Sequence, residues 1–402
     1  METTKKKSNF WALMSICGIM FGAYVGPGFA SGTQTVSYFL TKGWIGVFIG
    51  PLLAGLLCFI FCFLLFDISR IYKPKTYREA YDTIYQSKGL RLFFGNFKEV
   101  QVVVVILIAL SAQISTSAIL LNQVFGLPLA VGSLIFCAAV LVISIWGSAF
   151  LRKAGSVLSI CILLICVFIA VVCLQNAWPG AVSFLNSGTS YTDFGYTPFS
   201  AWFNMLMIVV FFMNGYEACV PASIGIINTR RDVLTVAGIT ALLCSLSTVI
   251  FTVIFASGMP EIVGNSIPTL WAIDTLSNAG RIAQIIYVVF ALAAMLSSCA
   301  AFIFTVCDRF ERPLEKVFKK SRPMTIKIGI AVVFILICTF GSTFGLLNII
   351  KYGYTTFTSI VGPVMLIPLV VSVPYRLYKD KKIGSKSKAK EPELTGIEAE
   401  NL

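Results

Sequence analysis

The sequence predicts an all-α polytopic membrane protein with ten transmembrane helices, in two five-helix halves, with broken helices one and six. Three observations support this fold class: the composition, the spacing of the apolar runs, and two interruptions rich in glycine and proline. Hydrophobic residues make up 57% of the 402 residues, charged residues only 12%, and the mean hydropathy is +0.87. A soluble domain of this size does not carry so apolar a surface, so most of the chain must lie in lipid.

The apolar runs are long enough to cross the membrane as helices. About 20 residues are needed to cross about 30 Å of hydrocarbon. Ten runs meet this length, at residues 11–41, 44–67, 98–121, 128–148, 154–175, 199–227, 233–256, 280–306, 325–342 and 353–377.

The distribution of basic residues predicts the orientation. All but three of the 31 Lys and Arg fall in the N-terminal segment, in alternate loops such as 70–98, and in the C-terminal tail. Basic residues in short loops stay on the cytoplasmic side, so we expect a multi-pass protein of the cell (plasma) membrane with both termini cytoplasmic. Two cytoplasmic termini require an even number of spans, in agreement with ten.

Three regions follow from this topology. Residues 1–10 form a cytoplasmic N-terminus, residues 11–377 form the transmembrane domain, and residues 378–402 form a charged tail that we expect to be disordered. The net charge of +13 reflects the topology and contact with anionic lipid headgroups, and we expect no nucleic-acid partner.

The first span contains a break. Residues 22–32 hold four glycines and Pro27, which leave backbone groups without helical partners. In lipid such groups need another partner, so the pattern predicts a binding site near the midplane on a discontinuous helix. The amides around Gly28 to Ser31 suit a carboxylate.

The sixth span contains the second break. Residues 212–221 hold Asn214, Gly215, Glu217 and a proline within a long apolar run. Breaks in spans one and six predict an inverted repeat, with repeat one at about 11–175 and repeat two at about 199–377. This inference uses hydropathy and break position only.

At this point the chain resembles the LeuT-type fold of the amino acid, polyamine and organocation superfamily. The run Gly28 to Gly32, followed by Gln34, is more narrowly similar to the YkvI-like amino-acid permease family. The resemblance implies a secondary active transporter that moves a small amino-acid-like or amine solute by alternating access. A non-transporting nutrient sensor on the same fold is the alternative.

The resemblance also implies a sodium site. Sodium-coupled members hold the ion with carbonyls of the first break and with an Ala-x-x-Ser-Ser motif in helix eight. The matching positions are Gly22, Val25, Ala294, Ser297 and Ser298. A hard cation suits such neutral oxygens, which the helical spacing places on neighbouring turns. The alternative is that these serines bond back to i−4 carbonyls or pack helices.

Sodium is favoured over a proton as the coupling ion. Proton-coupled relatives carry a lysine inside helix five, and the matching interior, residues 157–172, has no charge here. A proton-coupled permease remains an alternative.

The substrate site is expected where the two breaks meet. Glu217 is the one carboxylate well inside a span, and an intramembrane charge is a functional-site hypothesis by default. It would pair with a substrate ammonium or take up a proton; the alternative is a structural bond to backbone amides. Gln113 either contacts the ligand or packs helices. The candidate substrate-binding residues are Tyr24, Gly26, Gly28, Phe29, Ala30, Ser31, Gln113, Asn214, Gly215, Tyr216 and Glu217.

The sequence offers no catalytic motif. No Ser-His-Asp set, metal cluster or nucleotide loop is visible, and the chain has no histidine, so we expect no enzyme. We expect no cofactor apart from Na⁺ as the coupling ion. The expected partners are a small-molecule solute, sodium and the lipid bilayer.

Overall fold

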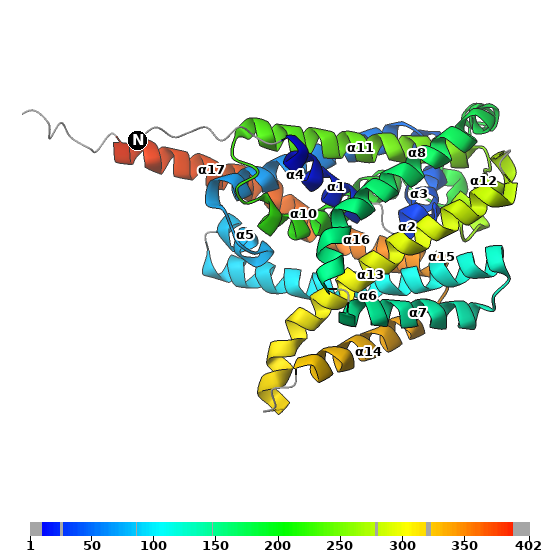
Figure 1. The fold of residues 1–402 in the computed structure, drawn as a ribbon. Helices are drawn as coiled ribbons and strands as arrows, with labels where there is room; N and C mark the ends of the chain where they lie inside the picture. Colours follow the sequence, from blue (N-terminus) through cyan, green and yellow to red (C-terminus); the bar gives the residue numbers. More distant parts are fainter. Residues whose placement is uncertain are drawn as a thin grey trace, which may run out of the picture.

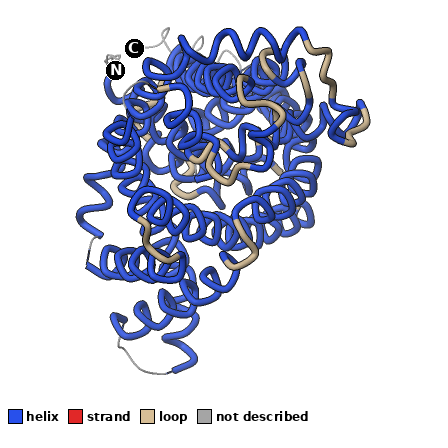
Figure 2. Tube along the Cα trace, turned by 90° about the vertical axis from the view of Figure 1, so that its right-hand side faces the viewer, coloured by secondary structure: helices blue, strands red, loops and turns tan. Residues whose placement is uncertain are grey.

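The computed structural model describes residues 10–24, 27–85, 87–146, 148–277, 280–318 and 323–388, and it forms no strand within them. Long helices run side by side across Figure 1, and Figure 2 looks along them from one end. Seven helices in the described part are long and apolar enough to cross a membrane, and two shorter apolar helices accompany them. The structure thus confirms the all-α membrane fold.

Most spans are continuous helices. The helix of the third predicted span, α6, begins earlier than predicted, and that of the fifth, α8, is longer at both ends. Their bounds are α4 (Ile49–Tyr72), α6 (Lys88–Phe125), α7 (Leu129–Trp146), α8 (Ser148–Asn186), α11 (Arg230–Ala256), α13 (Gly280–Phe318) and α14 (Pro323–Ser342).

The first span is interrupted at the predicted place. Helix α1 (Phe10–Tyr24) precedes the short helices α2 (Pro27–Ala30) and α3 (Thr33–Tyr38), and within the described residues the helix is interrupted at Ser31 and Gly32. Gly32 joins α2 to α3 with φ +85°, a conformation that side chains disfavour. A β-carbon at Gly32 would also lie 2.6 Å from the Phe255 ring, so this turn requires glycine.

The sixth span is interrupted too, but the predicted position within 212–221 is wrong. Helix α9 (Pro198–Met207) ends before Ile208 and Val209, and α10 (Val210–Ser223) then runs through the whole motif. Gly215 has a packing role instead. A β-carbon there would lie 3.0 Å from the Ala23 β-carbon, so glycine lets α10 approach α1 closely.

The last span contains two wide turns. Helix α15 (Leu346–Asn348) leads into the π-helix η5 (Ile349–Tyr354), and α16 (Thr355–Val361) leads into the π-helix η6 (Gly362–Leu366) and then into α17 (Ile367–Lys388). Residues 378–388 are therefore helical, against the expectation of disorder. Extending an existing helix avoids the cost of nucleation. Residues 389–402 lie outside the described part.

The helices form two packed groups. Helices α1, α4, α10 and α11 pack on one another and are called the first group; α6, α7, α13 and α14 form the second group. Helix α8 contacts both groups through α1, α11 and α13.

Short elements cover the two ends of the bundle. One end, called the α5 face, carries α5 (Tyr77–Ile84) against α4, α6 and α10. The other end, called the α12 face, carries η4 (Glu261–Gly264) and α12 (Pro268–Leu276). The two faces lie at opposite sides of Figure 1. The short helices η1 (Leu40–Lys42), η2 (Trp44–Gly46) and η3 (Tyr191–Phe194) connect further elements.

Candidate substrate and ion site

The carbonyl groups after the first break are satisfied by other parts of the protein. The Ala30 carbonyl accepts hydrogen bonds from the Thr269 hydroxyl at 2.9 Å and from the Tyr287 hydroxyl at 2.8 Å. The Ser31 carbonyl accepts from the Thr269 amide at 3.0 Å, and the Ser31 hydroxyl donates to the Gly28 carbonyl at 3.1 Å. Helices α12 and α13 therefore hold α2 in place. No sequence pattern pointed to Thr269 or Tyr287.

Tyr24 and Phe29 face α11. The hydroxyls of Tyr24 and Thr248 lie 2.6 Å apart, and the rings of Tyr24 and Phe29 have centroids 5.2 Å apart. The Phe29 ring also packs against Phe251, at 5.1 Å. Phe29 is buried, so Tyr24 and Phe29, both predicted to bind the substrate, form a cluster of packed aromatic rings with Phe251 in this conformation.

Two buried glutamines lie near the interrupted helix. A β-carbon at Gly28 would come 2.8 Å from Oε1 of Gln34, so this amide lies directly against α2. Gln113 is on α6, and α2 packs against α6. The Nε2 atoms of both glutamines are buried and have no hydrogen-bond partner within the described residues. Such unused donors suit an oxygen of a ligand, since leaving them unpaired costs about 1–3 kcal/mol each.

Ser298 joins α13 to α6. Its hydroxyl donates to Oε1 of Gln113 at 2.7 Å, and it lies 3.1 Å from the carbonyl of Ala294, the i−4 bond that sequence analysis weighed as the alternative. Cys299 also donates to Gln113, at 3.0 Å. Two of the predicted sodium ligands, the Ala294 carbonyl and the Ser298 hydroxyl, are thus adjacent.

The remaining candidate ion ligands are placed only in part. Gly22 lies in the last turn of α1. Val25, Gly26 and the side chains of Asn214 and Ser297 lie outside the described residues. The described part contains no group of three or more His, Cys, Asp or Glu side chains that could hold a metal ion.

Glu217 forms an ion pair with Lys98. The prediction that Lys98 belongs to the loop 70–98 is wrong, because Lys98 lies within α6 and is fully buried. Its ammonium also donates to Oε1 of Gln101 at 2.9 Å and lies 5.4 Å from the centroid of the Tyr81 ring. A carboxylate inside a span needs a partner, and that need is the one sequence signal that could have prompted a search for Lys98.

Tyr216 lies beside this pair. Its hydroxyl is 2.7 Å from the hydroxyl of Ser69 on α4, and its ring meets that of Tyr81 edge to face at 6.4 Å. The predicted substrate residues therefore divide into two sets. Tyr24, Phe29, Ala30 and Ser31 contact α11, α12 and α13, whereas Tyr216 and Glu217 contact α4, α5 and α6.

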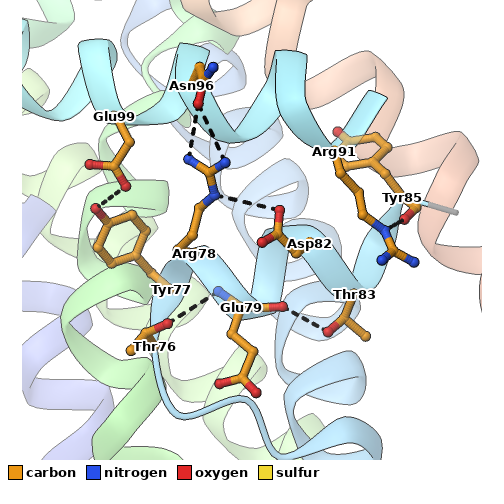
Figure 3. A network of polar contacts seen from close by, with 10 residues as sticks. All are labelled: Thr76, Tyr77, Arg78, Glu79, Asp82, Thr83, Tyr85, Arg91, Asn96 and Glu99. Atoms are coloured by element: carbon orange, nitrogen blue, oxygen red, sulfur yellow. Dashed lines mark hydrogen bonds and ion pairs between the residues drawn. The ribbon is translucent and has the colours of Figure 1, made fainter. Parts of the chain in front are cut away.

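Helix α5 is attached to the start of α6 by a polar network (Figure 3). The Tyr77 hydroxyl donates to Glu99 at 2.6 Å, and the Arg78 guanidinium donates to Oδ1 of Asn96 at 3.4 Å. Arg309 of α13 pairs with the same carboxylate, Glu99. These contacts attach α5 to the second group through α6 and Glu99, while α5 also packs against α4 and α10 of the first group.

Comparisons with known proteins identify the fold. No model of a known protein family matches the chain, and no curated protein matches its sequence. A manganese transporter of Eremococcus coleocola, in complex with an aromatic bis-isothiourea compound, has a similar structure: 16% identity over 92% of this chain and 80% of that chain, with a TM-score of 0.54.

Mhp1, a nucleobase-cation-symport-1 family transporter, is also similar. Its closed conformation with bromovinylhydantoin bound shares 18% identity over 92% of this chain and 80% of that chain, with a TM-score of 0.53. Its inward-facing conformation shares 19% identity over 89% of this chain and 75% of that chain, with a TM-score of 0.53. At such identities the similarity shows the fold alone. The chain is a multi-pass membrane protein with the LeuT-type fold, which these transporters share.

Proposed function

We propose that the protein is a secondary active transporter that moves a small amino-acid-like or amine solute by alternating access, with sodium as the coupling ion. The observation that carries the proposal is the pair of buried, unpartnered amide nitrogens of Gln34 and Gln113 at the interrupted first span. A substrate carboxylate would accept from these donors. The run Gly28 to Gly32 supports a YkvI-like amino-acid permease within this fold.

Sodium coupling is supported by the adjacent oxygens of Ala294 and Ser298. In this proposal they act with Ser297 and with carbonyls of Gly22 and Val25. Ser298 also bonds Gln113, so a sodium ion at Ser298 would influence a residue that we assign to substrate binding. This link would make solute binding depend on the ion, which is what a symporter requires.

The orientation is part of the proposal. In this proposal the α5 face lies on the cytoplasmic side of the plasma membrane and the α12 face outside, with both termini cytoplasmic, and the positions of the basic loops support this orientation. On this basis the solute would enter from the α12 face and leave from the α5 face.

A thermal-shift comparison tests the sodium assignment. Sodium should raise the unfolding midpoint of the purified protein above its value in potassium or choline at equal ionic strength. A ligand at 100 times its Kd stabilises the folded state by about 2.7 kcal/mol. Ser298→Ala should abolish the difference, and Thr305→Ala, an exposed hydroxyl on the same helix, should preserve it. An equal shift in all three salts would overturn sodium coupling.

Flux measurements test transport itself. Proteoliposomes with an imposed sodium gradient should accumulate one of a panel of amino acids and amines. A solute that stabilises the protein without any flux would indicate the sensor alternative. Uptake driven by a pH gradient alone would indicate a proton-coupled permease, the second candidate, which the buried Lys98–Glu217 pair favours because it places a titratable carboxylate within the bundle.

A further inference from the structure

The ion pair between Lys98 and Glu217 crosses from one helix group to the other. Lys98 belongs to α6 of the second group and Glu217 to α10 of the first. The exposed fractions of their side chains are 0% and 10%. A bond between the groups at this place must break if the groups separate on the α5 face.

Both members of the ion pair lie beside residues that are held by further contacts. Helix α5 is fixed to α6 through Tyr77 and Arg78 (Figure 3), and its Tyr81 ring lies beside Lys98. On the other side, Tyr216 is held to α4 through Ser69, within the first group. Separation of the groups would therefore part Lys98 from Glu217, and α5, which packs against both groups, would lose its contacts with one of them.

Unused polar atoms surround the pair. The Tyr81 hydroxyl and Nε2 of Gln101 are buried without hydrogen-bond partners in the part of the chain that the structure describes. When water enters, these groups help to solvate the separated charges. The surroundings thus suit a pair that is formed and broken repeatedly.

We propose that the Lys98–Glu217 pair is the lock that closes the α5 face. This inference rests on the proposed alternating access, and it assigns Glu217 to closure of the pathway instead of contact with the substrate. Removing one member of a buried pair leaves an uncompensated charge, whereas apolar replacement of both is often neutral or stabilising. Charge makes the closure reversible, because water stabilises the separated ions but not separated apolar side chains.

Hydrogen exchange of the full chain in lipid nanodiscs tests the lock. Glu217→Gln should speed backbone exchange in α5 and α10 by about tenfold or more, and leave η4 and α12 unchanged. The swap Lys98→Glu with Glu217→Lys should restore exchange to within about threefold of the wild type. Glu99→Gln is the matched control, since Glu99 is the next residue on α6 and its partners Tyr77 and Arg309 lie on α5 and α13, not on a helix of the first group; it should leave exchange in α10 unchanged.

A second variant separates a lock from a general loss of stability. Lys98→Met with Glu217→Leu should slow exchange in α5 and α10 to or below the wild-type rate, because the apolar contact has no hydrated open state. Faster exchange throughout the bundle in Glu217→Gln, or an equal effect of Glu99→Gln, would overturn the proposal. The exchange experiment needs no solute. If the wild-type protein shows no flux in proteoliposomes, the transport proposal is contradicted, and the exchange rates still test the lock independently.

Discussion

The two faces of the bundle are closed by different chemistry. On the α12 face, the carbonyls of Ala30 and Ser31 accept hydrogen bonds from Thr269 and Tyr287, all of them neutral groups. On the α5 face, closure involves the buried charges of Lys98 and Glu217. A neutral hydrogen bond contributes a net 0.5–1.5 kcal/mol, roughly, because water replaces it easily. A buried charge that loses its partner costs about 3–5 kcal/mol.

This difference implies unequal resistance to opening. The α12 face can open by exchanging several weak bonds for water, one after another. The α5 face opens only when one strong contact is broken and both charges are hydrated. Four predictions test this contrast, from the largest expected effect to the smallest.

Breaking the charged contact should have the largest effect. Lys98→Met leaves the Glu217 carboxylate buried without its cation and should lower the free energy of unfolding by about 3–5 kcal/mol. Adding Glu217→Leu should recover most of this loss. Chemical unfolding of the two single variants and the double variant gives the coupling energy. Simple addition of the two single effects would contradict a direct interaction.

The turn at Gly32 should be the most sensitive point of the α12 face. Gly32→Ala forces alanine into a φ of +85° and puts its β-carbon 2.6 Å from the Phe255 ring. The substitution should lower the free energy of unfolding by about 2–3 kcal/mol. Gly264→Ala, on the same face with open space around the new β-carbon, should change stability by no more than about 0.5 kcal/mol. Equal effects of the two substitutions in thermal unfolding would refute this explanation.

Lys42 provides the contrast with Lys98, since it is a buried lysine whose contacts are neutral. Its ammonium donates to the Ser37 carbonyl at 3.1 Å and the Thr41 hydroxyl at 2.8 Å, and lies 3.3 Å from the centroid of the Tyr196 ring. Burial lowers the pKa of Lys42 from its ordinary value of 10.5 to about 7. In that interval the unfolded chain binds more protons than the folded one.

The free energy of unfolding should therefore rise as the pH increases above about 7. Below about pH 7 the folded chain buries the charged lysine, and the full free-energy cost of that burial is present. The gain attributable to Lys42 between pH 7 and 8.5 should be up to about 2 kcal/mol. Lys42→Met should flatten this part of the stability profile. A profile of unchanged slope in that variant would show that Lys42 does not titrate there.

The smallest effect is expected for a single neutral donor. Tyr287→Phe removes one of the two hydroxyls that donate to the Ala30 carbonyl, and Thr269 remains. The loss of stability should be about 1 kcal/mol or less. Tyr287→Phe with Thr269→Val should cost more than the sum of the single changes, because the carbonyl is then unpaired. A loss as large as that of Lys98→Met would remove the contrast between the faces.

The sequence was informative where lipid constrains it. Span lengths and the interruption within residues 22–32 follow from hydrocarbon thickness and from backbone groups that need partners, so both could be predicted. Gly215 was misread, because a glycine in a membrane helix marks either a break or a close approach, and only the position of α1 decides between them.

The polar contacts were mostly out of reach of the sequence. Thr269 and Tyr287 meet Ala30 from a distant part of the chain, and ordinary loop and helix residues give no sign of that. Lys98 was counted as a loop residue because charge is the usual mark of a loop. The need of Glu217 for some partner was visible, but which partner it has depended on how α6 packs against α10.

The same ion pair also affects how the protein is made. Lys98 enters the membrane as part of the third span, long before the ribosome has synthesised Glu217 in the sixth. Until then a newly inserted first half holds a lysine without its carboxylate, so it cannot reach its final packing alone. Folding of the first half thus waits for the second, and a chain interrupted between the two should remain a target for quality-control proteases.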